Sequence, residues 1–186
     1  MKRILFILIF LLGFVPLQAF AAATTTPVVN HTSDIPEQLL DSDGDGYSDA
    51  LELQDGFDPF STSTVSLQKT ISVSLKDQRL RYYTGKYLVK EINISSGLRG
   101  TPTPVGTFTI EKKKLLVHYK GEGYDFPNTK WNMQFKYHIK GSYFIHGAFW
   151  HKRFGHPASH GCVNVSYADM EPLYRWTPTS TPVFIK

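Results

Sequence analysis

The stretch that decides the fold reads Lys69-Thr70-Ile71-Ser72-Val73-Ser74-Leu75. Its apolar residues alternate with small polar residues, which is the period of a β-strand that buries one face. Further short apolar segments with turn-forming residues between them follow at 80–83, 87–94, 107–110, 115–119, 135–139, 143–145 and 182–185. The sequence therefore predicts a mainly β protein, in which segments 80–83 and 87–94 form a hairpin around Thr84-Gly85.

One segment has helical periodicity. After Ser166, apolar residues recur at roughly helical spacing from Tyr167 to Trp176. The composition favours strands elsewhere, because the chain is rich in aromatic and β-branched residues and has few long runs of helix formers. We therefore expect a β-sheet domain with one or two short helices.

The N-terminus has the layout of an export signal. It starts with Met1-Lys2-Arg3, continues with an apolar run over 4–15, and ends with small residues up to Ala23. This pattern predicts a signal peptide over residues 1–23 and an exported chain located in the periplasm or cell envelope. The alternative is an uncleaved membrane anchor, since the apolar run can be extended to about twenty residues. Pro16 and the alanine-rich end favour cleavage.

Charge divides the rest of the chain. Residues 24–64 carry nine acidic and no basic side chains, whereas residues 65–186 carry 18 basic and seven acidic ones. We interpret residues 24–38 as a flexible linker, 39–64 as a separate acidic segment and 65–186 as one domain. A basic domain favours anionic partners such as wall polymers or membrane head groups, and export argues against nucleic acid. The alternative is that the lysines only solvate the outer faces of strands.

The acidic segment contains the spacing of a calcium loop. Oxygen ligands stand at positions 1, 3, 5, 9 and 12 of residues 41–52, a glycine stands at position 6, and the residue at position 7 offers its carbonyl. The predicted ligands are Asp41, Asp43, Asp45, Tyr47, Asp49 and Glu52. The alternative is an acidic linker that binds nothing.

The only cysteine of the chain lies in Ser159-His160-Gly161-Cys162-Val163-Asn164. A thiolate is a nucleophile, and it needs a base or a cationic neighbour because the ordinary thiol pKa is about 8.5. Gly161 leaves space beside the sulfur and exposes backbone N–H groups. These features predict a catalytic cysteine suited to acyl transfer. The alternative is an inert cysteine that packs as a small apolar residue.

Several histidines are candidates for the base. His146 is the best placed, because it directly follows the apolar segment 143–145 and precedes Gly147, so a strand end would hold the imidazole. A competing interpretation is a zinc cluster built from His146, His151, His156, His160 and Cys162. The regular ligand spacing of structural zinc sites is missing from this set.

The segments His146-Gly147 and 159–164 together resemble the active-site signature of the L,D-transpeptidase catalytic domain family. Segments 71–80, 101–108 and 168–174, and Pro182-Val183, add to the resemblance, which spans about residues 67–186. The segment 41–59 resembles a thrombospondin type 3 or EF-hand-like repeat, in which the calcium is structural. The first resemblance implies a β-sandwich-like fold and residues 65–186 as the catalytic domain.

The family resemblance also implies a reaction on peptidoglycan stem peptides. Cys162 would attack the L-to-D bond of a tetrapeptide stem and release D-Ala, with His146 as base and the Gly147 carbonyl orienting its ring. The acyl group would pass to an amine, giving a 3→3 cross-link or anchoring a wall-linked protein, or to water in a carboxypeptidase. No cofactor is implied for catalysis, and we expect a monomer.

The remaining pocket roles rest on the same resemblance. Ser159 and His160 would shape the pocket, and the backbone at Gly161 and Cys162 would hold the oxyanion. Asn164 stands where many relatives have arginine, so a charge contact to the substrate carboxylate would come from elsewhere. The rival function is a calcium-dependent wall-binding module whose cysteine only packs.

Overall fold

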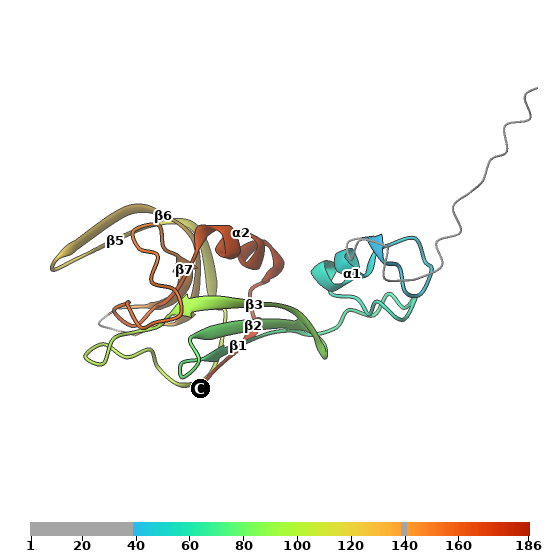
Figure 1. Ribbon diagram of the computed structural model, residues 1–186, viewed down its shortest axis with the longest axis horizontal. Coiled ribbons are helices and arrows are strands. Elements are labelled where there is room, and N and C mark those ends of the chain that lie inside the picture. The colour runs from blue at the N-terminus through green and yellow to red at the C-terminus, as the bar shows by residue number, and fades with distance from the viewer. Residues whose placement is uncertain (1–38, 139–140) are drawn as a thin grey trace, which may run out of the picture. The chain divides into compact units, whose positions relative to one another are not determined.

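The computed structural model describes residues 39–138 and 141–186 (Figure 1). The predicted signal peptide and linker, residues 1–23 and 24–38, lie outside the described residues. Among the described residues, no helix is long and apolar enough to cross a membrane. The elements are α1 (Asp49–Asp55), β1 (Lys69–Ser74), β2 (Arg79–Thr84), β3 (Tyr87–Ser95), β4 (Gly106–Thr109), β5 (Lys112–Gly121), β6 (Tyr124–Lys136), β7 (Tyr143–Gly147), β8 (Val163–Val165), α2 (Tyr167–Trp176) and β9 (Pro182–Ile185).

The strands form one sheet in the order β4-β9-β1-β2-β3-β8-β7-β6-β5. Most neighbours are antiparallel, but β1 pairs with β9 and β7 pairs with β8 in parallel. The sheet curls, because Phe108 of β4 packs edge-on against Phe135 of β6 although many strands separate them in the sheet order. The predicted mainly β, sandwich-like fold with short helices is confirmed.

The hairpin and the helix expected from the sequence are present. β1 and β2 pair antiparallel from Lys69↔Thr84 to Ser74↔Arg79, and β2 continues into β3 across the turn at Gly85. Helix α2 has the bounds that its periodicity predicts, and Ser166 caps it by accepting a hydrogen bond from the Asp169 N–H.

Two features of the sheet differ from the sequence-based expectation. The strand predicted over 135–139 has the wrong bounds, since β6 runs from Tyr124 to Lys136 and residues 137 and 138 lie outside it; residue 139 is not among the described residues. The first part of β6 is mostly exposed and contains Pro127, so it shows no apolar alternation and resembles a strand break. Strand β8 is absent from the predicted strands, because three residues beside a loop carry no periodic signal.

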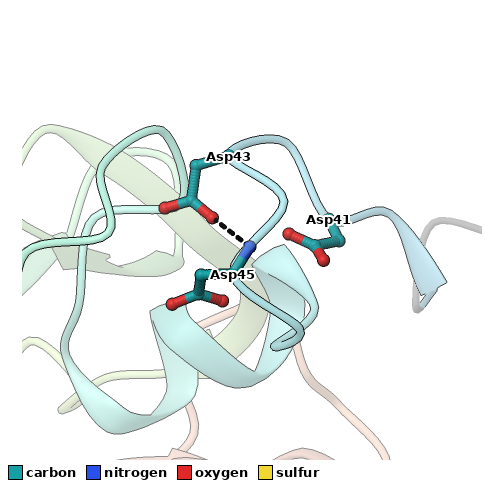
Figure 2. Close-up of side chains that lie close together, drawn as sticks. All are labelled: Asp41, Asp43 and Asp45. Carbon is teal, nitrogen blue, oxygen red and sulfur yellow. Dashed lines mark hydrogen bonds between the residues drawn. The ribbon is translucent and has the colours of Figure 1, made fainter.

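The acidic segment forms a loop followed by a short helix. The loop brings Asp41, Asp43 and Asp45 close together, and helix α1 follows it (Figure 2). Gly56 ends the helix in the left-handed conformation, with φ of 104°, which a glycine adopts without strain. The ligand spacing predicts the loop but not the helix.

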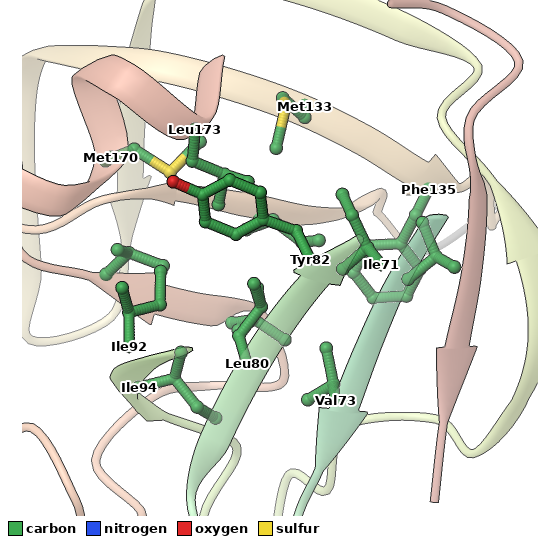
Figure 3. Close-up of a cluster of buried hydrophobic side chains, with 14 of the residues drawn as sticks. Ile71, Val73, Leu80, Tyr82, Ile92, Ile94, Met133, Phe135, Met170 and Leu173 are labelled. Atoms are coloured by element: carbon green, nitrogen blue, oxygen red, sulfur yellow. The ribbon is translucent and has the colours of Figure 1, made fainter. Parts of the chain in front are cut away.

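The core lies between the curled sheet and α2 (Figure 3). Ile71, Val73 and Leu80 come from β1 and β2, and they are fully buried. Met170 and Leu173 of α2 are fully buried in the same cluster. The alternating residues of β1 thus have the buried face that their period predicts, and Ile145 and Val163 of the same cluster hold β7 and β8 beside each other.

Candidate active site

Strands β7 and β8 bring His146 and Cys162 together. They pair in parallel, with Ile145 opposite Val163 and His146 opposite Asn164. Because side chains alternate along a strand, Cys162, directly before β8, lies on the same face as His146, diagonally across the two strands. Both residues line one cavity of about 800 Å³. The predicted nucleophile and base therefore share a site.

The tautomer of His146 follows from its neighbour. Its Nδ1 atom lies 2.8 Å from the Gly147 carbonyl oxygen, and a carbonyl only accepts hydrogen bonds, so Nδ1 carries the proton. Nε2 is then left with a free lone pair. Burial lowers the pKa of His146 to about 4, against a smaller opposing effect of the Gly147 hydrogen bond. The imidazole is consequently neutral near pH 7 and able to accept a proton.

The thiol of Cys162 is also held in its neutral form. Cys162 is partly exposed to the cavity. Its desolvated surroundings raise its pKa to about 11, although a backbone hydrogen bond with Phe144 acts in the opposite direction. With both groups neutral at rest, the thiol proton would move to the imidazole only when the sulfur attacks a substrate.

The turn before Cys162 is braced from within. The Ser159 hydroxyl donates to the Cys162 carbonyl at 2.5 Å and accepts from the Gly161 N–H at 3.1 Å. Gly161 has φ of 112°, and a Cβ added there would lie 2.8 Å from the ring of Tyr143. Ser159 and Gly161 thus fix the backbone that carries the thiol. The sequence predicts two backbone oxyanion donors, at Gly161 and at Cys162. Because the Gly161 N–H already donates to Ser159, the Cys162 N–H is the donor that stays a candidate.

Asn164 is buried on the floor of the same cavity. Its Nδ2 lies 3.0 Å from Nε2 of His151, whose Nδ1 accepts from the Arg153 N–H. A neutral imidazole accepts at only one nitrogen, so the network is consistent when the Asn164 amide turns its oxygen toward the His151 Nε2–H. In the orientation that the structure has, Asn164 Oδ1 is buried and has no hydrogen-bond partner among the described residues.

An aromatic wall closes one side of the cavity. Phe126 of β6 stacks on Trp150 with ring centroids 3.9 Å apart, and Tyr124 stacks on His160 at 5.0 Å. His160 therefore lies in the lining of this cavity, and its role in shaping the pocket for substrate stays a prediction. Sequence reasoning missed Trp150 and Phe126, because their stacking joins segments with no shared local pattern.

Two basic side chains line the cavity, and one of them has an acidic partner, since Lys120 Nζ lies 3.5 Å from Asp125 Oδ2. Lys120 and Arg153 line it, and none of its described lining residues is acidic. A cavity of this kind suits a ligand with a carboxylate. Lys120 was not singled out from the sequence, since one lysine among many in a strand carries no local signal.

Tyr119 is a further residue that sequence reasoning missed. Its ring stacks on His146 with centroids 4.6 Å apart, and its hydroxyl donates to Asn132 Oδ1 at 2.9 Å. Asn132 is fully buried and donates through Nδ2 to the Thr129 carbonyl. The Asn132 hydrogen bond therefore anchors the Tyr119 ring, and that ring supports one face of the imidazole.

The histidines and the cysteine do not gather as a metal cluster. Across residues 39–138 and 141–186, the one group of three His, Cys, Asp or Glu side chains with converging ligand atoms consists of Asp41, Asp43 and Asp45. Their ligand atoms lie within 4.8 Å of one another. The zinc interpretation of the cysteine site therefore has no geometric support among these residues.

Glu52, the last of the predicted calcium ligands, lies on helix α1. It is 5% exposed, and its Oε2 is buried without a hydrogen-bond partner among the described residues. Burial, followed by the charges of Asp43 and Asp45, raises the pKa of this carboxyl. Asp49 accepts hydrogen bonds from the Ser42 N–H and hydroxyl, and the side chain of Tyr47 is exposed.

The chain forms a curled β-sheet domain whose candidate reactive groups are a histidine on β7 and a cysteine directly before β8. The chain belongs to the L,D-transpeptidase catalytic domain family, whose model matches residues 68–185. A search of curated proteins finds no match to this chain.

Solved structures agree with the family. An L,D-transpeptidase from Mycobacterium smegmatis is similar in fold with a TM-score of 0.60 at 20% identity, covering 65% of this chain and 59% of its own. A cysteine-to-serine variant of Enterococcus faecium L,D-transpeptidase matches at 28% identity and a TM-score of 0.58, covering 64% and 50%. The catalytic domain of an E. faecium L,D-transpeptidase acylated by ertapenem matches at 28% identity and a TM-score of 0.55, covering 66% and 99%. The chain thus spans little more than half of the longer structures and nearly all of an isolated catalytic domain.

Proposed function

We propose that this protein is a peptidoglycan L,D-transpeptidase in which Cys162 is the nucleophile and His146 the base. The observation that carries the proposal is the placement of both residues on one face of the parallel β7–β8 pair, inside one cavity. The fixed Nδ1–H of His146 leaves Nε2 as the proton acceptor. Family membership supports peptidoglycan stem peptides as the substrate class, and the donor we propose is a tetrapeptide stem.

The chemistry proceeds in two halves. In the first, the Cys162 proton moves to His146 Nε2 while the sulfur attacks the carbonyl carbon of the L-to-D bond. The Cys162 N–H donates to the resulting oxyanion, and His146 then protonates the departing amine of D-Ala, which leaves a thioester. In the second half, an acceptor amine attacks the thioester, His146 takes the amine proton, and the thiolate leaves and regains that proton.

The cavity suits the proposed donor. The D-Ala end of a tetrapeptide carries a carboxylate, and Arg153 and Lys120 are the cations that line the cavity. Asn164 adds an unpartnered polar group beside them. Aromatic rings at Phe126 and Trp150 offer a flat apolar wall for the stem.

The proposed reaction takes place in the cell envelope. Residues 1–23 have the layout of a cleaved export signal, and residues 24–38 have that of a linker. Mass spectrometry of the protein purified from its own envelope tests this: a mature N-terminus near residue 22 or 24 is expected. An intact Met1 in the membrane fraction would instead indicate an anchor.

The enzymatic test uses disaccharide-tetrapeptide and mass spectrometry. The chain is expected to release D-Ala and form a 3→3 cross-linked dimer, whereas Cys162→Ala gives neither product while keeping its fold. Hydrolysis alone would indicate a carboxypeptidase. Absence of any Cys162-dependent reaction would favour a wall-binding module.

A second test needs no natural substrate. The solved E. faecium catalytic domain is acylated by ertapenem, so a covalent ertapenem adduct is expected on Cys162 of this chain. Peptide mapping locates the adduct, and Cys162→Ala should show no mass shift. An adduct elsewhere would contradict the assignment of the nucleophile.

A further inference from the structure

Gln78 has an unusual backbone conformation for a buried residue. It lies in the turn between β1 and β2 with φ of 53°, a region that glycine and asparagine adopt more readily than glutamine. The other described non-glycine residues with positive φ are Asn128, Trp131 and Ser180, and of these four Gln78 alone is buried, at 4% exposure. The fold therefore keeps a strained residue at a point where its side chain is enclosed.

The side-chain amide of Gln78 uses both hydrogens of its nitrogen. Nε2 donates to the Leu75 carbonyl at 2.6 Å and to the Ser96 hydroxyl oxygen at 2.7 Å. Oε1 accepts from the Ser96 N–H at 2.9 Å. Because the Leu75 carbonyl only accepts and the Ser96 N–H only donates, these partners fix the orientation of the amide. Gln78 thus holds Ser96, which is also 4% exposed, at two atoms.

Ser96 in turn holds the chain that leads to Cys162. Its carbonyl accepts hydrogen bonds from the Ala158 N–H at 2.9 Å and from the Ser159 N–H at 3.0 Å. The Ser159 hydroxyl donates to the Cys162 carbonyl. Strand β3 ends directly before Ser96 and pairs with β8, which begins directly after Cys162. A continuous set of hydrogen bonds therefore leads from the Gln78 amide to the backbone of Cys162.

We propose that Gln78 is a positioning residue for Cys162, acting through Ser96 to hold the thiol toward His146. The inference rests on the proposed function, because it concerns the placement of the nucleophile. Gln78 is not among the residues that line the cavity, so it acts through other residues and not on the substrate. Displacing a reacting group by about 1 Å is enough to slow attack strongly, and the bracing of residues 158–162 opposes such a displacement.

The alternative is that the Gln78 amide only closes the β1–β2 turn through its contact with Leu75. In that case, loss of the amide would lower stability with no specific effect on kcat. The two hydrogen bonds to Ser96 favour positioning, because they reach outside the turn and join it to the segment that carries the nucleophile. Kinetic and exchange measurements separate the two roles.

Gln78→Asn shortens the side chain by one methylene and keeps an amide. Asn128 adopts φ of 54° elsewhere in the chain, so asparagine suits this backbone. The shorter amide should lose Ser96, and kcat for the tetrapeptide reaction should fall about tenfold or more while KM changes less than about threefold. Ser180→Asn, at an exposed position with φ of 67°, is the matched control and should keep its kcat. An unchanged kcat in Gln78→Asn would overturn the proposal.

Ser96→Ala is a second variant with a smaller effect on the fold. It removes the hydroxyl that accepts from Gln78 Nε2 and keeps the backbone contacts of Ser96, so kcat should fall several-fold. All variants are assayed well below their Tm, so that the folded protein is compared. Because both substitutions break the same link, the double variant should lose little more kcat than Gln78→Asn alone. Independent, multiplying losses of kcat would overturn the link through Ser96.

Amide hydrogen exchange tests the bracing without any turnover. The Ala158 and Ser159 N–H groups should exchange at least about tenfold faster in Gln78→Asn than in the unaltered chain. The Met170 N–H of α2, which donates to the Ser166 carbonyl, should accelerate much less. This result in a chain without transpeptidase activity would support the bracing and count against the proposed function alone. Equal acceleration at all three amides, or none, would overturn the inference.

Discussion

The Nδ1 atom of His146 lies 2.8 Å from the carbonyl oxygen of Gly147, the next residue in the chain. This short-range contact fixes the imidazole tautomer without a third side chain, since the acceptor is the backbone. A backbone carbonyl carries no full charge, so it orients the ring but does little to stabilise an imidazolium. The low pKa of His146 agrees with this, because desolvation outweighs the hydrogen bond.

Stability should depend on pH through His146. Its folded pKa of about 4 lies below the unfolded value of about 6.5, so between these values the unfolded chain binds a proton that the folded chain does not. Stability therefore falls as pH drops from 6.5 toward 4, by about 3 kcal/mol from this group at most. Urea unfolding at several pH values should show that the free energy of unfolding falls less steeply with decreasing pH in His146→Gln than in the unaltered chain. Parallel curves for the two proteins would contradict a neutral, buried His146.

The Cys162 thiol should react slowly with a small electrophile when no substrate is bound. With a pKa of about 11, its thiolate fraction at pH 7 is about 300-fold lower than that of a thiol at its ordinary pKa of about 8.5. Alkylation by iodoacetamide should keep accelerating above pH 9, and free glutathione serves as the reference. A rate that levels off near neutral pH would indicate a stable thiolate–imidazolium pair instead.

Tyr119 should act as a positioning residue for His146. Tyr119→Leu removes the ring stacked on the imidazole, so kcat should fall about tenfold or more with a smaller change in KM. Tyr119→Phe keeps the ring but leaves the buried Asn132 Oδ1 without its donor, which should cost about 1–3 kcal/mol of stability with most activity retained. Equal losses of kcat in both variants would argue against positioning by ring contact.

Gly161→Ala should distort the turn that carries the thiol. Its φ of 112° disfavours any L side chain, and the new methyl would lie 2.8 Å from Tyr143. Gly155→Ala is the matched control, because Gly155 has φ of 96° but a Cβ added there meets nothing within 4 Å. Both variants should lose about 1–2 kcal/mol to backbone strain, and Gly161→Ala should lose about 1–3 kcal/mol more. Thermal unfolding measures the difference, and equal losses would show that Tyr143 yields freely.

Local patterns predicted much of the fold because they depend on burial along one strand or helix. The alternation in Ile71 and Val73 predicts the strand whose buried face they form, and the periodicity after Ser166 predicts α2. The first part of β6 escaped prediction for the opposite reason. Pro127 and the exposure of this part remove the alternation, and only pairing with β5 makes the segment a strand.

For the site, the sequence by itself determined the reactive groups: a lone thiol in a glycine-containing turn, and a histidine at a strand end. It also determined the spacing of the acidic residues in 41–52, which predicts a calcium loop. Only the tertiary structure decided that Cys162 and His146 share a cavity, that Tyr119 stacks on the imidazole, and that Glu52 is buried. The reason is physical: residue type and spacing set what a side chain is able to do, whereas contacts between distant segments depend on strand register and burial, which arise only when the whole sheet forms.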